Sequence, residues 1–389
     1  MAIELSYVLL TPYSIRKSRT GGIVSRLLSR TGLELVAARM FSPGGELVEK
    51  YAAGMVTDAD PTHRAAQELI KKYILSQFAA PSRGTKPRVL MLVFRGEDAV
   101  KKIREVVGHI LNERWSGETI RDTFGDYISD KDGSAIYFEP AVLAAPDRAS
   151  ADRDLKLWAE HSDRDGGLLE KSIDYPEGAK IQKTLVLIKP DNFRFPNARP
   201  GGVIDLFSRT GLSIIACKVH HMSVAQAEEF YGPVLAVLQD KLRGRAGELA
   251  KKALEPIFEL PFSPEVEKAL GELLGPINGR ENWEDIVEFM SGRRPGSCPA
   301  DLRDQPGTEK CLALIYQGED AVRKIREVLG PTDPAKAPTG TIRREFGQTI
   351  MVNAAHASDA PENAQREMGI IRIEENNFRT LIESWLAQK

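Results

Sequence analysis

The chain has 389 residues, of which 42% are hydrophobic and 28% charged, with 32 glycines and 23 prolines. This composition is typical of a globular protein and excludes a collagen, a disordered chain and a disulfide-stapled miniprotein. The 53 basic and 55 acidic residues give a formal net charge of -2, which offers no global attraction for nucleic acid or an anionic membrane.

The length exceeds the usual range of about 100 to 200 residues for one domain and therefore favours two. The three cysteines show no Cys-x-x-Cys spacing, which argues against a zinc site and favours a reducing compartment. The first residues lack the pattern of a signal peptide, and no stretch approaches the roughly 18 apolar residues of a membrane span. We expect a cytoplasmic protein with no membrane partner and no nucleic-acid partner.

The first half of the chain begins with an apolar run at residues 8–10, which predicts a strand. The segment from Gly21 to Gly32 predicts an amphipathic helix that begins and ends at glycines. Further strands are expected at 35–40 and 90–94, and the second of these leads into another helix.

The second half repeats this order. Strands are expected at residues 185–188, 214–219 and 312–316, with a fourth near 348–352. Two strand-helix-strand passes in each half indicate an α+β fold made of two tandem ferredoxin-like (βαββαβ) domains. In each domain, helices would cover an antiparallel four-stranded sheet.

The two halves are copies of one sequence. Residues 96–108 and 318–330 differ at only two of 13 positions, and a further pair, 21–33 with 201–212, occurs in the same order. Matches of this quality indicate a tandem duplication.

The spacing of the matched segments locates an insertion. The offset between matched residues grows from 179 after the first helix to 222 at the Thr-Ile-Arg segment, so the second copy carries 43 extra residues. We place them at about 235–282, where leucines at helical spacing predict extra helices. The expected domains are residues 1–160 and 183–389, joined by a polar, glycine-bearing linker at 161–182.

Groups that bind phosphate are concentrated in the second copy. Lys189 follows the first strand of that copy, and Pro190 stops the strand, which leaves the ammonium group at its edge. Arg326 and Arg343 can each bind phosphate oxygens through two hydrogen bonds. His356 lies between alanines, which allow close approach to its imidazole, but a solvent-facing turn residue is the simpler interpretation of a histidine taken alone.

In these segments the sequence resembles the nucleoside diphosphate kinase family. The resemblance rests on Thr184-Leu-Val-Leu-Ile-Lys-Pro-Asp191, on the segment from Gly330 to Arg343, and on Asn353-Ala-Ala-His-Ala-Ser-Asp359. It implies an enzyme that moves the γ-phosphoryl group of ATP or another nucleoside triphosphate to a nucleoside diphosphate. The transfer would pass through a phosphohistidine in a ping-pong cycle, with Mg²⁺ held by the nucleotide's phosphates and not by protein side chains.

The resemblance also assigns roles to residues. His356 would be the nucleophile, Glu367 the carboxylate that orients its ring, and Tyr231 a neighbour that helps to position the phosphohistidine. The residues expected around the nucleotide are Lys189, which also acts in catalysis, Arg326, Thr332 and Arg343 on the phosphates, Asn353 on the ribose, and Ser358 near the histidine. Without the resemblance, Arg326 could form only a salt bridge and Ser358 only a turn.

Two departures from the family concern the nucleotide base. The position of the family's base-stacking phenylalanine is Asn282 here, and the adjacent Trp283 either supplies the aromatic face or belongs to the core. Ala357 stands where the family has a glycine after the histidine. An alternative function is therefore a catalytically weak or inactive nucleotide-binding or scaffold protein.

The first copy lacks the reactive residues. Leu143 stands at the position of His356, and a leucine cannot accept a phosphoryl group. Arg104, Arg121 and Tyr51 are retained, and they either bind an anion or form inherited surface salt bridges. We expect the two copies to pack as an intrachain pseudo-dimer, with a further homo-oligomer left open. The other replacements are Thr11 for Lys189, Pro140 for Asn353 and Asp154 for Glu367.

Overall fold

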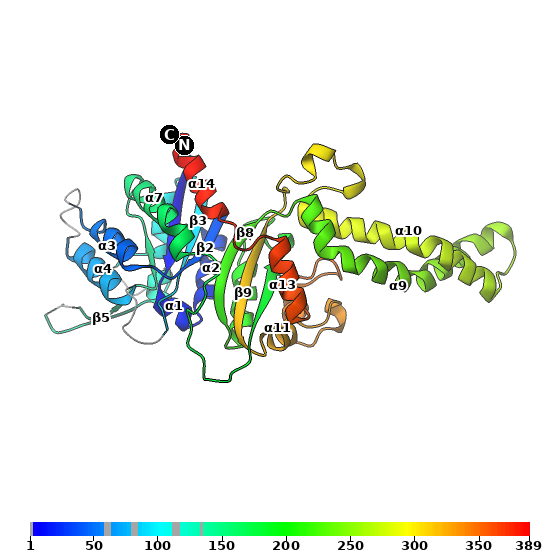
Figure 1. The fold of residues 1–389 in the computed structure, drawn as a ribbon, viewed down its shortest axis with the longest axis horizontal. Helices are drawn as coiled ribbons and strands as arrows, with labels where there is room; N and C mark the ends of the chain where they lie inside the picture. The colour runs from blue at the N-terminus through cyan, green and yellow to red at the C-terminus, as the bar shows by residue number, and fades with distance from the viewer. Residues whose placement is uncertain (1–2, 58–63, 79–84, 111–116, 133–134) are drawn as a thin grey trace. The chain divides into compact units, whose positions relative to one another are not determined.

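The computed structural model describes residues 3–57, 64–78, 85–110, 117–132 and 135–389 (Figure 1). The chain forms two compact units, one within residues 1–219 and 312–389 and the other within 220–311. The first unit holds both four-stranded sheets, and the second holds two long helices of the second copy.

Each copy contributes one sheet, and the strand order is the same in both. The first sheet has the order β2-β3-β1-β6, with β1 (Ile3–Leu10), β2 (Glu34–Phe41), β3 (Val89–Glu97) and β6 (Val142–Ala144). The second has the order β8-β9-β7-β10, with β7 (Ile181–Ile188), β8 (Ser213–His220), β9 (Cys311–Glu319) and β10 (Ala355–Ala357). β1 runs antiparallel to β3 and β6, as β7 does to β9 and β10. The predicted tandem ferredoxin-like fold is confirmed.

The predicted position of the fourth strand in the second copy is wrong. Residues 348–352 close a turn, in which the N–H groups of Gln348 and Thr349 both donate to the carbonyl of Val352. The place beside β7 is taken by β10, a few residues later in the chain. The sequence pattern of residues 348–352 predicts a strand, but backbone hydrogen bonds of this segment are made within the turn.

Helices complete each copy, and the first copy also contains a small hairpin. In the first copy they are α1 (Pro12–Arg16), α2 (Thr20–Arg30), α3 (Gly45–Ala53), α4 (Arg64–Gln77), α5 (Ala99–Val107), α6 (Ile120–Phe124) and α7 (Arg148–Asp165), with the hairpin β4 (Asp126–Ser129) and β5 (Ala135–Glu139). In the first unit, the second copy adds η2 (Pro190–Asn192), α8 (Arg199–Ser208), α11 (Ala321–Leu329), η5 (Pro334–Lys336), α12 (Ile342–Phe346), α13 (Pro361–Ile370) and α14 (Asn377–Leu386).

The nearly identical helices α5 and α11 begin and end in the same way. Asp98 and Asp320 precede them with positive φ angles of 52° and 54°, and Gly108 and Gly330 follow them with φ angles of 87° and 83°. Glycine adopts a positive φ angle without strain, so both helices end at a conformation that only glycine readily supplies. The shared sequence therefore produces the same local structure twice.

The last helix of the second copy lies in the core of the first. Phe378 of α14 is fully buried, and its ring centroid is 5.6 Å from that of Phe41, which in turn packs 4.9 Å from Trp158. Arg379 pairs with Asp163 of α7 at 2.7 Å. Burial of a phenylalanine stabilises by about 1.5 to 3 kcal/mol, so α14 ties the two copies together.

Helices α2 and α8 also join the copies, through glycine. A Cβ built on Gly21 would lie 2.6 Å from the carbonyl oxygen of Gly201, and one built on Gly201 would collide with the carbonyl of Gly21 and the backbone of Ser25. The two helix backbones are therefore in direct contact, which requires glycine at positions 21 and 201.

The second unit is an antiparallel helical hairpin of α9 (Val224–Phe258) and α10 (Pro264–Ser291), followed by η3 (Pro295–Ser297) and η4 (Ala300–Leu302) (Figure 1). Ser223 and Gln226 form a capping box at the start of α9, and Ser263 caps α10 ahead of Pro264. Across the described ranges of the chain, no helix has the length and apolar character to span a membrane.

Candidate active site

His356 lies at the middle of β10, the edge strand of the second sheet. Its backbone pairs with Leu187 of β7, and its side chain is 22% exposed. Asn192, which is fully buried, donates from Nδ2 to the carbonyls of Ala354, at 2.8 Å, and Lys189, at 3.0 Å. It thereby joins the end of β7 to the start of β10. Sequence reasoning missed this positioning residue, although it stands only three positions after Lys189.

A buried carboxylate orients the imidazole. Nε2 of His356 lies 2.9 Å from Oε2 of Glu367, and the hydroxyl of Ser358 donates to the same oxygen at 2.6 Å. Glu367 is 5% exposed and Ser358 is fully buried. Because an ionised carboxylate only accepts hydrogen bonds, this contact places the proton of the neutral ring on Nε2 and the lone pair on Nδ1.

An amide and an ammonium group are linked beside the histidine. Nζ of Lys189 donates to Oδ1 of Asn353 at 3.0 Å and to the carbonyl of Met351 at 2.6 Å. Nδ2 of Asn353 donates to the carbonyl of Thr332 at 3.1 Å. Lys189 and Asn353 are 6% and 2% exposed, so the positive charge is held among carbonyl oxygens at a fixed place.

The guanidinium group of Arg343 is anchored by backbone carbonyl groups. Arg343 of α12, 7% exposed, donates from Nη1 to the carbonyl of Gly330 at 3.1 Å and from Nη2 to the carbonyl of Ala355 at 3.2 Å. Ala355 directly precedes His356, so Arg343 and Lys189 both lie next to β10. Their charges suit the oxygens of a phosphate group.

Asp359 connects Arg326 to the same place. The pKa of Asp359 is lowered, first by a hydrogen bond from Asn363 and in smaller part by the positive charge of Arg326. Arg326 on α11 is therefore close enough to act electrostatically on the residues that follow β10. Sequence reasoning missed Asp359, although a carboxylate three residues after a histidine is a visible signal.

The structure brings eight of the ten predicted site residues into the first unit: Lys189, Arg326, Thr332, Arg343, Asn353, His356, Ser358 and Glu367. The other two, Tyr231 of α9 and Trp283 of α10, belong to the second unit. Both are buried, and Nε1 of Trp283 donates to the carbonyl of Tyr231 at 2.9 Å. This burial favours the core interpretation of Trp283 over a base-stacking one.

The corresponding place in the first copy is filled by tyrosines. Leu143 pairs with Leu9 in the register that His356 has with Leu187. The hydroxyl of Tyr7 donates to Asp154 at 2.8 Å and lies 3.1 Å from the hydroxyl of Tyr51. The carboxylate at the position of Glu367 thus binds a phenol in place of an imidazole, and the network is buried.

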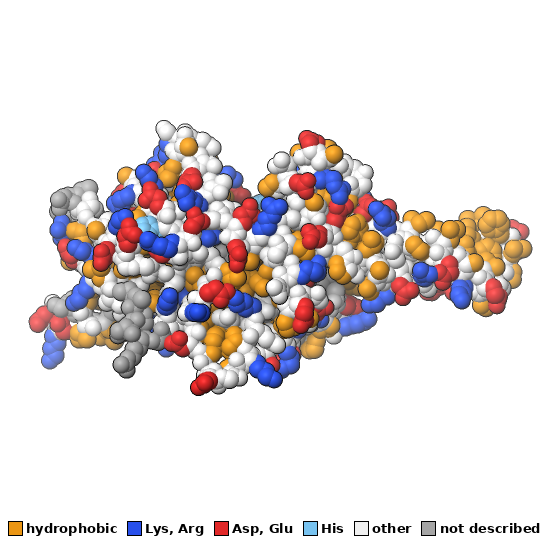
Figure 2. Space-filling model, in the orientation of Figure 1, with side chains coloured by type: hydrophobic (Ala, Val, Ile, Leu, Met, Phe, Trp, Pro, Cys, Tyr) orange, Lys and Arg blue, Asp and Glu red, His pale blue; other side chains and the backbone are white. Residues whose placement is uncertain are grey.

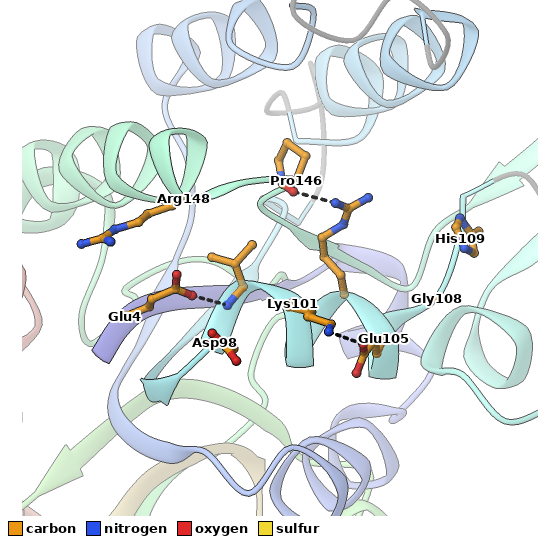
Figure 3. Close-up of a pocket in the computed structure, with 10 residues that line it drawn as sticks. Glu4, Asp98, Lys101, Glu105, Gly108, His109, Pro146 and Arg148 are labelled. Carbon is orange, nitrogen blue, oxygen red and sulfur yellow. Dashed lines mark hydrogen bonds and ion pairs between the residues drawn. The ribbon is translucent and has the colours of Figure 1, made fainter. Parts of the chain in front are cut away.

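The retained arginines of the first copy bind backbone carbonyls. Arg121 donates to Gly108 and Val142, and Arg104 donates to Pro146 at 2.8 Å (Figure 3). An open cavity of about 470 Å³ lies beside Arg104 between α5 and the start of α7. Both acidic and basic side chains line this cavity, so its charge shows no preference for an anion. They include Glu4, Asp98, Lys101, Glu105 and Arg148.

A ferredoxin-like domain that orients an imidazole with a buried carboxylate, and surrounds it with anchored ammonium and guanidinium groups, defines a phosphoryl-transfer enzyme. The family model described as nucleoside diphosphate kinase matches residues 4–163 and 300–376. The chain belongs to the nucleoside diphosphate kinase family, and it is a phosphotransferase.

Individual relatives match half of the chain. Nucleoside diphosphate kinase 2 of Protochlamydia amoebophila is 31% identical over 188 residues, which cover 48% of this chain and 89% of that protein. The nucleoside diphosphate kinase of Helicobacter pylori strain P12 is 31% identical and covers 48% and 92%. Among solved structures, the NDP kinase of Pyrobaculum aerophilum is 27% identical, with a TM-score of 0.33, and covers 49% of this chain and 94% of its own.

Proposed function

We propose that this protein transfers the γ-phosphoryl group of a nucleoside triphosphate to a nucleoside diphosphate by a ping-pong mechanism through phospho-His356. The observation that carries the proposal is the 2.9 Å contact between His356 Nε2 and Glu367 Oε2, supported by Ser358. A protein that only bound nucleotides would need neither the histidine nor a buried carboxylate to orient it.

In the first half-reaction, the lone pair on Nδ1 of His356 attacks the γ-phosphorus. A nitrogen–phosphorus bond forms, the bond from phosphorus to the bridging oxygen breaks, and the electron pair leaves with the nucleoside diphosphate. The ring becomes positively charged, and the carboxylate of Glu367 stabilises that charge through Nε2–H. A second nucleoside diphosphate then attacks the phosphohistidine, and the same steps run in reverse.

The cations act on the charge that spreads over the transferred group. Lys189 and Arg343 are anchored by carbonyl and amide oxygens, so they pay little reorganisation energy when the transition state forms. We assign Arg326 and Thr332 to the phosphates, Asn353 to the ribose and Tyr231 to positioning of the phosphohistidine.

The residues of the site fit a nucleotide that carries its own Mg²⁺. Its donors are ammonium, guanidinium and amide groups, which bind phosphate oxygens directly. Among the described residues there is no cluster of three or more His, Cys, Asp or Glu side chains that could hold a metal ion. Mg²⁺ that arrives with the nucleotide would neutralise phosphate charge.

The first copy is proposed to act as the intrachain partner of the second. The glycine contact between α2 and α8 and the insertion of Phe378 into the first core support this role. A cytoplasmic location and domain boundaries near residues 160 and 183 are proposed from the sequence. The alternative function, a weak or inactive nucleotide-binding or scaffold protein, makes a different prediction in the labelling test.

The test is incubation of the full chain with γ-labelled ATP and Mg²⁺ in the absence of an acceptor. We expect acid-labile label on the wild-type protein, released on addition of a nucleoside diphosphate, and no label on His356→Ala. The Glu362→Ala variant is the control, because Glu362 is exposed in the first turn of α13. A wild-type protein that binds nucleotide but stays unlabelled would establish the binding or scaffold alternative.

A further inference from the structure

The two helices of the second unit meet through glycines. Gly271, Gly275 and Gly279 recur every fourth residue along α10. A Cβ on Gly275 would lie 2.6 Å from Cα of Arg243, and one on Gly279 would lie 2.5 Å from Cα of Gln239. The backbones of α9 and α10 are in direct contact along this line, so large side chains are excluded from it.

The large apolar side chains of the hairpin consequently lie outside its own interface. On the helices, Leu249 is 51% exposed, Leu273 65% and Ile277 58%. At the C-terminal end of α9, next to the turn that joins the helices, Ile257 is 72% and Phe258 60% exposed. Figure 2 shows hydrophobic side chains gathered at the far end of the hairpin. Contiguous apolar surface of this kind marks an interaction site.

One face of α9 carries a row of charges next to exposed apolar residues. Intervals of four and three residues place the first five members of the row on one side of the helix, and the sixth, Glu259, is the left-handed residue that directly follows α9. In chain order their signs are plus, plus, minus, plus, minus, minus, and all six side chains are at least partly exposed. We call this set the α9 charge row: Lys241, Arg245, Glu248, Lys252, Glu255 and Glu259.

Reading the α9 charge row from its last member to its first gives, at every position, the charge opposite to the one found when the row is read forward. If two copies of α9 lie antiparallel, Lys241 of one faces Glu259 of the other, Arg245 faces Glu255, and Glu248 faces Lys252. Within the described residues, Lys241 and Glu259 form no ion pair in their own chain, and both are exposed. Opposite charges that meet across a two-fold axis fix both the register and the direction of pairing.

The apolar residues beside the charge row follow a similar reversal, centred on residue 249, one position before the centre of the charge row. Leu242, Leu249 and Pro256 recur at intervals of seven residues, which keeps them on one side of α9. Antiparallel pairing places Leu242 near Pro256 of the second copy and Leu249 near Leu249 of the second copy, close to the axis. This arrangement buries apolar surface and pairs charges at its edge, as antiparallel helix pairs do.

We propose that the hairpin is a self-association surface whose partner is a second copy of this chain, paired antiparallel along the α9 charge row. Anionic lipid fits the surface less well, because the hairpin between residues 237 and 281 carries seven basic and eight acidic residues. The proposal concerns α9 and does not depend on the chemistry at His356.

The test measures self-association of the full chain by sedimentation velocity over a range of concentrations, with Lys241→Glu, Glu259→Lys and the double variant that carries both. Lys241 and Glu259 are 18 residues apart, about 27 Å along one helix, so they cannot contact each other within a chain. Each single variant replaces two attractive pairs by two repulsive ones and should weaken dimerisation by on the order of tenfold or more. The double variant restores opposite charges and should recover wild-type association.

Two control variants keep the result interpretable. Lys268→Glu makes the same change of charge on an exposed residue of α10 and should leave dimerisation unchanged. Leu273→Glu tests the exposed apolar side of α10. If Leu273→Glu abolished the dimer and Lys241→Glu did not, the proposed pairing through α9 would be overturned. Far-UV circular dichroism checks that each variant is folded.

Dimerisation should also weaken as salt is raised, because the pairs at the edge are exposed. A wild-type chain that remains monomeric up to about 100 µM overturns the proposal and assigns the exposed face to a different protein or to a lipid surface. Single variants that associate like the wild type, or a double variant that is not rescued, would also overturn it.

Discussion

The proton on Nε2 of His356 decides which ring nitrogen can react. Glu367 holds that proton, and Ser358 holds Glu367, so three side chains fix one tautomer. A histidine tautomer is set by the group that its other nitrogen binds, and the same logic recurs at many catalytic histidines. In the proposed mechanism, the reactivity of His356 therefore depends on a carboxylate that acts through the imidazole.

Replacing Glu367 by alanine should lower the turnover number of phosphoryl transfer by about 100-fold, because the ring loses its orientation and its charge stabilisation. The KM for the nucleotide should change far less, since Glu367 contacts only His356 and Ser358 among the proposed site residues. Steady-state kinetics would measure the turnover number and the KM separately. A rise in KM with unchanged turnover would show that Glu367 acts in binding, and Glu362→Ala provides the matched control on the same helix.

At the scale of elements, a basic residue on the second strand of each copy holds the end of a helix. Lys218 of β8 donates to the carbonyls of Ile371, at 3.4 Å, and Arg372, at 2.6 Å, just after α13. At the matching position of β2, Arg39 donates to the carbonyls of Ser162 and Gly166 around the end of α7. Cations placed at helix C-termini satisfy the last carbonyl groups.

Burial makes the Lys218 contact dependent on pH. Desolvation lowers the pKa of Lys218 to about 8, while Glu375 raises it and Arg39 and Arg372 lower it in smaller part. Between about pH 8 and the ordinary value near 10.4, the unfolded chain therefore keeps a proton that the folded chain has lost. In this window the Lys218 contribution to the free energy of unfolding becomes more favourable with rising pH, by at most about 1.4 kcal/mol per pH unit.

The measurement is urea unfolding of the wild type and Lys218→Met at several values between pH 7 and pH 10. The difference between the two proteins cancels the titration of other groups. This difference in the free energy of unfolding should shift in favour of the wild type above pH 8 and stay constant below pH 8. A difference that is flat across this range would mean that Lys218 keeps its ordinary pKa in the folded protein.

At the scale of the whole molecule, the two copies are held by contacts that neither could make alone. α14 leaves the second copy and completes the core of the first, and α2 meets α8 at Gly21 and Gly201. Both contacts require the two sequences to be present in one folded unit. These contacts support the proposal that the first copy acts as the structural partner of the second.

The Gly201→Ala variant should reduce the free energy of unfolding by about 1 to 3 kcal/mol, because its methyl group collides with the backbone of α2. Gly369→Ala is the matched control: Gly369 lies in α13 with open space around it, so alanine there should be neutral or slightly stabilising. Chemical denaturation would measure both. Equal effects of the two variants would show that the α2 and α8 backbones are not in contact.

Much of the fold followed from local pattern and from the repeat. The two ferredoxin-like sheets were predicted because apolar runs and glycine stops recur in the same order in both copies. The fourth strand was misplaced because residues 348–352 have the composition of a strand. Two segments could pair with the edge of β7, and only the tertiary structure selects residues 355–357 over 348–352. The positioning role of Asn192 was missed, since its side chain reaches a carbonyl more than 160 residues away.

The sequence by itself determined the duplication, the fold of each copy and the family, because these depend on residue order and on short segments such as 353–359. Tertiary structure alone decided which groups meet. It placed Glu367 on Nε2 of His356, put α14 into the first core, filled the vacant site with Tyr7 and Tyr51, and turned the apolar side of α9 outward. The physical reason is that contacts across long chain separations are selected by packing and by the pairing of buried polar groups, and neither is written in local periodicity.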